Sequence, residues 1–366
     1  MTTIAATPST APDAAPGISP AVLADGPHDP GSWQAIHIYY GASRRFMLVD
    51  CIKPLVDGLL TDGLLDSYFF INYWLEGPHL RLRLKPVRAA DTETVLHRAE
   101  EAIDAFLRAR PSLYEAKSGF YSELYNTLFD LEFTPEQRAH YLGPDGRMLI
   151  RDNNTRSREP YEPEYGKYGG PSGIDLAEWH FKHSSDQVIT IMRTTNAHLR
   201  RTVLGVASQL MMVMTTAFLP DATAAADYLE RYHGFWRRAF DTAGFIKDED
   251  YDQAYEIAGP GLRSRFAMVR EARTAGSAVR LPEFLREWAA HCAELYSRAV
   301  ALAESGQLIL RSWDDTCDEV ITDPAIATIR LLSPYMHMTN NRLGATLSDE
   351  AYLSYVLARA LRDGEA

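Results

Sequence analysis

Cysteine is scarce in this sequence, which has 3 in 366 residues, at Cys51, Cys292 and Cys317. No two of them have the CxxC spacing of zinc ribbons and redox motifs, so we expect neither a disulfide framework nor a zinc site. His180 and His183 are 3 positions apart, which can suit a metal, but no third ligand stands at a recognised spacing. We therefore expect an activity that needs no metal and no other cofactor.

Basic residues are also in the minority, since 37 Lys and Arg against 49 Asp and Glu give a formal net charge of -12. Phosphate binding needs a basic field, so we expect no general affinity for nucleic acid. A local cationic pocket inside an acidic protein would still suit a small anionic group. The acidic surface would also suit a basic peptide or partner.

Long hydrophobic runs are missing as well. Residues 203–220 fall short of the about 20 apolar residues of a spanning helix and include Ser, Gln and Thr, so they predict a buried core helix. Residues 1–31 hold no Lys or Arg and lack the apolar run of a secretory signal, and they predict a disordered tail. We expect a cytoplasmic protein without a membrane segment, with residues 32–366 as one domain.

The hydrophobic patterns predict an α+β fold. A strand over 33–41, a helix over 44–63, two strands joined by a turn at "EGPH" and a helix over 92–111 indicate a mostly antiparallel N-terminal sheet layer with packed helices. Residues 112–170 mix strand-like pieces such as "LYNTLFDLEF" with polar loops. The remainder has helical spacing, so we expect a helical C-terminal half.

Three short stretches contain residues that can carry chemistry. In "HLRLRLK", residues 79–85, the leucines alternate with Arg81, Arg83 and Lys85, so all three cations share one face of the predicted strand. An arginine fork binds a carboxylate bidentately. His79 and the preceding Gly-Pro turn lie beside these cations. The competing interpretation is a solvated outer face of the sheet.

The other two stretches are "PYEPEYGKYGG", residues 160–170, and "SPYMHMTNNRLG", residues 333–344. In the first, Lys167 and Glu164 predict an anion-binding pair or, alternatively, an ordinary surface ion pair. In the second, His337 is a candidate general acid or base, and a helix ending at Gly344 would place His337 and Asn341 on one face. A hydrogen-bonded core histidine is the alternative.

Taken together, and in this order, these stretches resemble the C-terminal, glutamate-eliminating domain of lantibiotic dehydratases and its free-standing relatives, the thiopeptide-type bacteriocin biosynthesis proteins. The resemblance covers roughly residues 33–362. It implies a lyase that acts on a precursor peptide with leader and core. A separate partner subunit would first glutamylate Ser or Thr, and this chain would eliminate glutamate to leave dehydroalanine or dehydrobutyrine. The resemblance leaves open whether the protein forms a homodimer.

The resemblance also implies roles for single residues. His337 would be the general acid or base, and Arg81 and Arg83 would hold the glutamyl group or its developing carboxylate. Lys167 stands where family members usually carry Arg, and Glu164 matches an acidic position that could hold the glutamyl ammonium. The further substrate-binding candidates are His79, Asn341 and Arg342, of which the last orients either the local helix or the substrate backbone.

Lys167 leaves alternatives open, because lysine keeps the charge of arginine but loses its bidentate fork. One alternative is the formal [4+2] cycloaddition of related stand-alone proteins, in which two dehydroalanines form the pyridine ring of a thiopeptide. That reaction would depend more on orienting two alkenes than on an anion pocket. The other alternative is a non-catalytic subunit that binds the precursor peptide and presents it to a partner.

Overall fold

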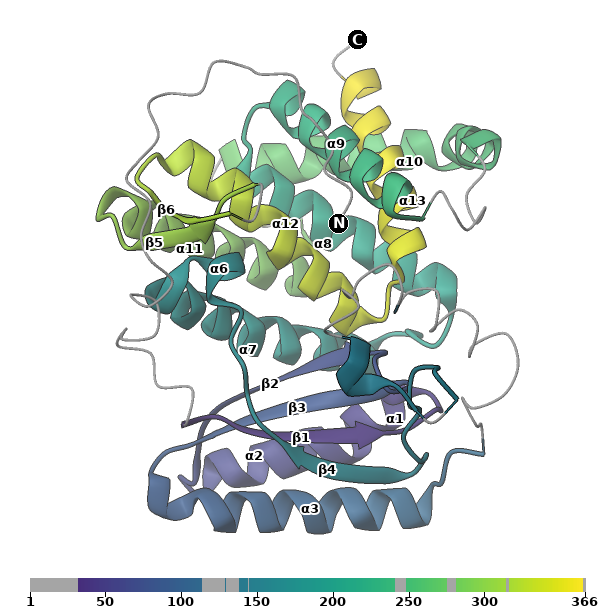
Figure 1. Ribbon diagram of the computed structural model, residues 1–366. Helices are drawn as coiled ribbons and strands as arrows, with labels where there is room; N and C mark the ends of the chain where they lie inside the picture. Colours follow the sequence, from purple (N-terminus) through teal and green to yellow (C-terminus); the bar gives the residue numbers. More distant parts are fainter. Residues whose placement is uncertain are drawn as a thin grey trace. The chain divides into compact units, whose positions relative to one another are not determined.

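The computed structural model describes residues 32–113, 129, 138–143, 145–240, 248–274, 281–313 and 316–364. Within the single domain predicted for residues 32–366, the described residues cluster into two compact units, divided between Pro163 and Glu164 (Figure 1). The predicted tail, residues 1–31, lies outside the described residues, as does the strand-like piece 124–133 except for Phe129.

The first unit contains a four-stranded antiparallel sheet with the strand order β2-β3-β1-β4. Its chain order of strand, helix, strand, strand, helix, strand is the split βαβ arrangement of ferredoxin-like folds. The predicted α+β class and the mostly antiparallel sheet layer are confirmed. The elements are β1 Gln34–Tyr39, α1 Arg44–Met47, α2 Lys53–Thr61, β2 Leu65–Tyr73, β3 His79–Pro86, α3 Thr92–Ala109 and β4 Thr155–Glu159.

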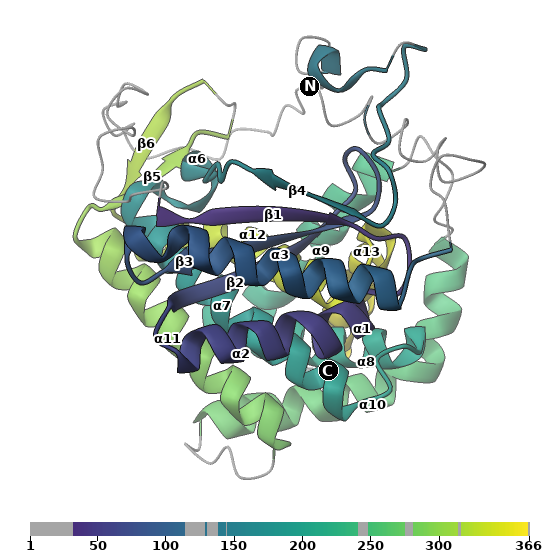
Figure 2. The same cartoon turned by 90° about the horizontal axis from the view of Figure 1, so that it is seen from below.

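The two faces of this sheet differ because side chains alternate along each strand. The helices α2 and α3 lie along one face, as Figure 2 shows. The buried apolar side chains on that face include Ile36, Ile38, Leu80, Leu82 and Leu84 from β1 and β3. The opposite face carries the histidines and arginines of the same two strands. The alternation along each strand therefore places apolar side chains in the core and polar side chains in a site on the other face.

The helix predicted over 44–63 is divided in two. A π-helical turn, Leu48–Ile52, separates Arg44–Met47 from Lys53–Thr61, and Pro54 begins the second piece. Proline has no N–H to donate, and its ring clashes with the carbonyl four residues earlier, so a wider turn just before it is expected. The predicted helix is therefore present, with a π-helical turn just before Pro54.

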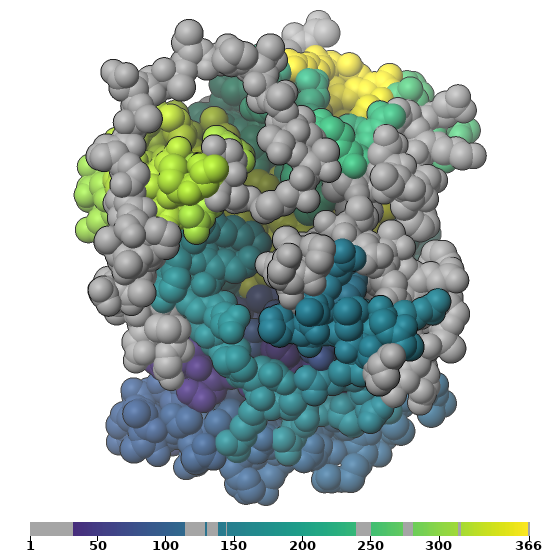
Figure 3. Space-filling model, viewed as in Figure 1, coloured from purple at the N-terminus to yellow at the C-terminus, as the bar shows by residue number. Residues whose placement is uncertain are grey.

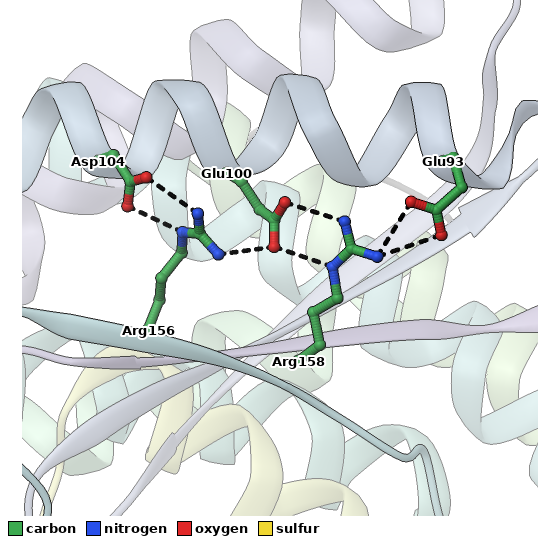
Figure 4. A network of polar contacts seen from close by, with 5 residues as sticks. All are labelled: Glu93, Glu100, Asp104, Arg156 and Arg158. Atoms are coloured by element: carbon green, nitrogen blue, oxygen red, sulfur yellow. Dashed lines mark hydrogen bonds and ion pairs between the residues drawn. The ribbon is translucent and has the colours of Figure 1, made fainter.

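A chain of ion pairs joins the edge strand β4 to α3 (Figure 4). Arg156 contacts Asp104 and Glu100, and Arg158 contacts Glu100 and Glu93, with Glu100 shared between the two guanidinium groups. In the space-filling view, α3 in blue and the teal segment that includes β4 both lie on the visible surface (Figure 3). The network therefore holds the outer strand of the sheet against its covering helix.

The second unit is helical, as predicted for the C-terminal half, and adds a β-hairpin that the sequence patterns did not predict. The run 203–220 falls in α8, as expected of a core helix, and no helix of the described residues is long and apolar enough to cross a membrane. The elements are α6 Tyr165–Tyr168, α7 Gly170–Thr194, α8 Arg200–Phe218, α9 Ala222–Phe240, α10 Asp248–Thr274, α11 Glu283–Glu304, β5 Leu308–Arg311, β6 Asp318–Ile321, α12 Pro324–Leu343 and α13 Leu347–Gly364.

The ends of α12 and α13 follow from their capping residues. Asp323 accepts a hydrogen bond from the backbone of α12, and Gly344 ends this helix in the left-handed region at φ 87°, as predicted. Two residues on, Thr346 and Asp349 cap the start of α13 reciprocally, at 2.8 and 3.2 Å between side chain and backbone. This short connection places Glu350 on the first turn of α13.

Candidate functional site

The first candidate site is the group of cations on β3, for which the sequence allowed either an anion site or a solvated strand face. The register of the sheet confirms that Arg81, Arg83 and Lys85 share one face, and it places His37 of β1 opposite Arg81. His79 shares this face too, but as the first residue of β3 rather than as part of the turn. The turn itself needs glycine, because Gly77 has φ 105°.

Each arginine of this face is held by a neutral histidine. Arg81 Nε donates to His79 Nε2 at 3.1 Å, and Nδ1 of the same imidazole lies 2.9 Å from the carbonyl of Gly77. Since guanidinium only donates, His79 carries its proton on Nδ1. Arg83 Nη1 donates in the same way to His37 Nε2 at 3.2 Å.

The electrostatics of this face keep both imidazoles uncharged. Burial lowers the pKa of His37 to about 2 and that of His79 to about 3, and the neighbouring arginines add to both effects. Burial likewise lowers the pKa of Arg83 to about 10, so this guanidinium keeps its charge near neutral pH. The histidines can therefore orient the arginines without neutralising them.

No carboxylate of the described residues forms an ion pair with Arg81 or Arg83. Their other contacts are aromatic, with Tyr73 at 3.5 Å from Arg81 and Tyr161 at 5.5 Å from Arg83. Nε of Arg83 is buried and has no hydrogen-bond partner in the described part of the chain. A buried charge in this state is costly unless an anion or polar group joins it.

The alternative of a solvated strand face is wrong for Arg83, whose exposed fraction is 5%. It fits Lys85 better, because this side chain is 36% exposed and lies 3.7 Å from Asp66. The three cations are therefore not equivalent. Two guanidinium groups form the candidate anion site, and the lysine is a partly exposed residue with a carboxylate beside it.

The second candidate site surrounds His337 on α12. Its Nδ1 lies 2.8 Å from Oε1 of Glu350, whose side chain is fully buried, whereas the imidazole is 24% exposed. Oε2 of the same carboxylate accepts from Tyr232 OH and, at 3.3 Å, from Asn340 Nδ2. The ring of Trp236 lies 5.2 Å from the imidazole. The histidine is thus hydrogen-bonded yet still partly accessible.

The other predicted residues of α12 differ in exposure. Asn341 is one turn from His337 and partly exposed. Arg342 is completely buried, donates from Nη1 to the carbonyl of Met338 at 2.9 Å and lies over the ring of Phe181 at 4.5 Å. Burial lowers the pKa of Arg342 to about 9. These contacts match a role in orienting the local helix, one of the two roles expected for this arginine.

Lys167 and Glu164 form the predicted ion pair at the start of the second unit. Their charged atoms are 3.3 Å apart and their side chains are 41% and 60% exposed. The glycine pair that follows lets the backbone approach β5, because Gly169 has φ 101° and its carbonyl accepts from Ile309 N at 3.1 Å. Lys167 therefore lies in the short helix just before this contact.

The sequence patterns missed His37, Glu350 and Tyr232. His37 becomes a candidate only through the pairing of β1 with β3, which places it opposite Arg81 and 3.2 Å from Arg83. Glu350 looks like an ordinary acidic residue in the first turn of a helix, and Tyr232 lies 118 positions away from it. No local signal in the sequence connects these residues.

The predicted residues thus form three groups. His79, Arg81 and Arg83 come together in the first unit, whereas Glu164 with Lys167 and His337 with its neighbours on α12 belong to the second. His180 bonds to His291 of α11 at 2.9 Å, and His183 stacks on the same ring at 3.8 Å. Among the described residues, no group of three or more His, Cys, Asp or Glu is arranged to hold a metal ion.

Comparison with known proteins gives one family and several similar folds. A model of the family described as lantibiotic biosynthesis dehydratase C-term matches residues 33–361. The pyridine synthase TbtD from thiomuracin biosynthesis is 21% identical with a TM-score of 0.71, over 91% of this chain and 98% of its own. TsrL is 19% identical with a TM-score of 0.64, over 91% of this chain and 95% of its own.

The tRNA-dependent lantibiotic dehydratase MibB from Microbispora sp. 107891 is 19% identical with a TM-score of 0.52. The match covers 94% of this chain and 29% of MibB. At these identities the three structures share the fold with this chain. No curated protein sequence matches it.

Proposed function

Because the chain belongs to the family of lantibiotic biosynthesis dehydratase C-terminal domains, we propose that it modifies a ribosomally made precursor peptide by eliminating glutamate from glutamylated Ser or Thr. The products are dehydroalanine or dehydrobutyrine and free glutamate. The observation that carries this proposal is the pair Arg81 and Arg83. They are oriented by neutral imidazoles, and no carboxylate of the described residues neutralises them.

The elimination removes the α-proton of the modified residue and breaks its bond between Cβ and the ester oxygen. The electron pair of the Cα–H bond forms the new double bond, and the ester oxygen leaves as part of a glutamate carboxylate. Negative charge therefore develops on the departing group, where charge-assisted hydrogen bonds contribute about 1.5–3 kcal/mol each. The two guanidinium groups supply donors of this kind.

The remaining predicted residues act on the proton and on the glutamyl group. His337 accepts the α-proton, because its imidazole is partly exposed and histidine is a common general base. Lys167 and Glu164 hold the charged ends of the glutamyl amino acid, Asn341 contacts the substrate, and His79 acts through Arg81, which it orients. A separate glutamylating dehydratase subunit supplies the substrate.

The test is to incubate the purified protein with glutamylated precursor peptide and to measure free glutamate and the mass of the dehydrated product. Arg83→Gln should lower glutamate release by about 100-fold or more, as loss of one preorganised donor does at other sites. Lys85→Gln is the matched control, because it removes a cation from the same strand face that already has a carboxylate beside it. Wild-type protein that releases no glutamate would disprove the proposal.

A second candidate, formation of the pyridine ring of a thiopeptide, is favoured by two observations. The fold similarity to the pyridine synthase TbtD extends over 98% of that chain. Lys167 also lacks the guanidinium group that would bind a carboxylate bidentately. Incubation with a dehydroalanine-containing azole peptide would then yield a pyridine macrocycle and the expelled leader. A non-catalytic binding subunit would give neither product and would still bind the precursor.

A further inference from the structure

We propose that Glu350 is a positioning residue that orients His337 and leaves the lone pair on Nε2 of its imidazole. This inference rests on the proposed role of His337 in proton transfer. Glu350 lies on the first turn of α13, and its side chain is fully buried. The reciprocal cap formed by Thr346 and Asp349 begins the helix immediately before it. The backbone that carries the carboxylate is therefore well defined.

The two oxygens of Glu350 have different partners. Oε1 faces His337 Nδ1 at 2.8 Å, while Oε2 accepts from Tyr232 OH and from Asn340 Nδ2 at 3.3 Å. Burial and the charge of Glu350 hold the pKa of Tyr232 well above its usual range, so the phenol remains a donor. Two donors on Oε2 thus leave Oε1 directed at the imidazole.

This arrangement determines the tautomer of His337. A carboxylate can only accept, so the imidazole carries a proton on Nδ1, and in its neutral form the lone pair lies on Nε2. Trp236 lies beside the ring, with centroids 5.2 Å apart and an interplanar angle of 39°. The carboxylate and the imidazole form the same relation as the acid and base of a catalytic triad, in which the acid orients the base.

Replacing Glu350 by glutamine should change His337 from the Nδ1–H to the Nε2–H tautomer. Asn340 Nδ2 can only donate, so the new amide should keep its oxygen on that side and turn its NH₂ group toward His337. Nδ1 must then accept, and the imidazole places its proton on Nε2. The base loses the lone pair that takes the substrate proton, although the shape of the buried side chain is almost unchanged.

The experiment combines a structural and a kinetic measurement. In the wild type, ¹⁵N NMR of the imidazole should show the Nδ1–H tautomer of His337, and in Glu350→Gln it should show Nε2–H. Glutamate release should fall by about 100-fold or more in kcat, with KM within about twofold, because the tautomer and not the binding site has changed. Glu230→Gln, on an exposed carboxylate of α9, should match the wild type in both measurements.

Three results would overturn the inference: Nε2–H in the wild type, an unchanged tautomer in Glu350→Gln, or unchanged kcat in a variant whose tautomer has reversed. The wild-type tautomer is measured without substrate, so it tests Glu350 even if Glu350→Gln fails to fold. Absence of glutamate release by the wild type would instead disprove the proposed function. In that case the same variants are assayed for pyridine formation.

Discussion

The buried pair His180 and His291 predicts that the second unit loses stability in mild acid. Thr339 Oγ1 donates to the carbonyl of Tyr335, so it cannot also donate to His180 Nε2 at 3.4 Å and must accept from it. His180 Nδ1 is then an acceptor, and His291 Nε2 donates to it at 2.9 Å. A second proton on His180 would go to Nδ1 and put two donors face to face, whereas a second proton on His291 would go to Nδ1, which is buried without a hydrogen-bond partner among the described residues.

Burial is the main cause of the low pKa of both imidazoles in the folded protein, and the neighbouring charges of Arg342 and His180 add to it. The unfolded chain binds protons below its ordinary histidine pKa of about 6.5, whereas the folded pair does not. The stabilisation is therefore complete above about pH 6.5 and decreases as the pH falls below it. For each fully displaced histidine, lowering the pH from 7.5 to 5.5 costs about 1.4 kcal/mol.

Urea unfolding followed by far-UV circular dichroism at these two pH values measures the loss directly. His291→Gln keeps a donor near the position of Nε2 but cannot take up a proton, so it should reduce the pH-dependent loss by about 1.4 kcal/mol. Cys292→Ala is the matched control on the same helix. It leaves a cavity next to the pair and should lower the free energy of unfolding equally at both pH values, because burial raises the pKa of this thiol well above its usual range.

The reasoning would be refuted if His291→Gln and the wild type lost the same free energy between the two pH values. A change in the urea dependence itself would instead indicate altered compactness or a transition that is not two-state. The comparison of the variant with the wild type cancels the contributions of the other titrating groups. It therefore isolates the histidine pair even though further imidazoles, such as His37 and His79, are also held neutral by burial.

Three further predictions address catalysis, the backbone and the edge of the sheet. His337→Ala should lower glutamate release by about 100-fold or more, and unchanged turnover would remove His337 from proton transfer. Gly169→Ala should cost about 2–4 kcal/mol in urea unfolding, because φ is 101° and a new Cβ would lie 2.6 Å from a leucine of β5. Gly63→Ala, with φ 66° and nothing within 4 Å, should cost only about 1 kcal/mol. Glu100→Gln should lower the melting temperature more than Glu93→Gln does, since of these two carboxylates only Glu100 contacts both arginines of β4. The difference between the two variants should become smaller at high salt, because salt screens these ion pairs. Equal effects at every salt concentration would contradict this.

Local patterns were sufficient wherever one element determines the outcome. The alternation in residues 79–85 correctly predicted a strand with the cations on one face, because side-chain direction along a strand depends only on position. Gly344 correctly predicted a helix end, because this effect arises within one turn of backbone. His337 was singled out for the same reason, from its place in a helical segment rich in polar side chains.

The partners of these residues could not be predicted, because they depend on which elements pack together. His37 meets Arg83 only because β1 pairs with β3, and Glu350 meets His337 only because the short connection after α12 brings the first turn of α13 to this histidine. Burial also depends on how the elements pack. Arg83 and Lys85 look equivalent in the sequence, yet Arg83 is buried, whereas Lys85 is partly exposed and lies beside a carboxylate. The sequence by itself determined the elements, the family and the candidate charges. Only the tertiary structure decided which charges are desolvated and which groups orient them, because desolvation and hydrogen-bond geometry arise from contacts between distant segments.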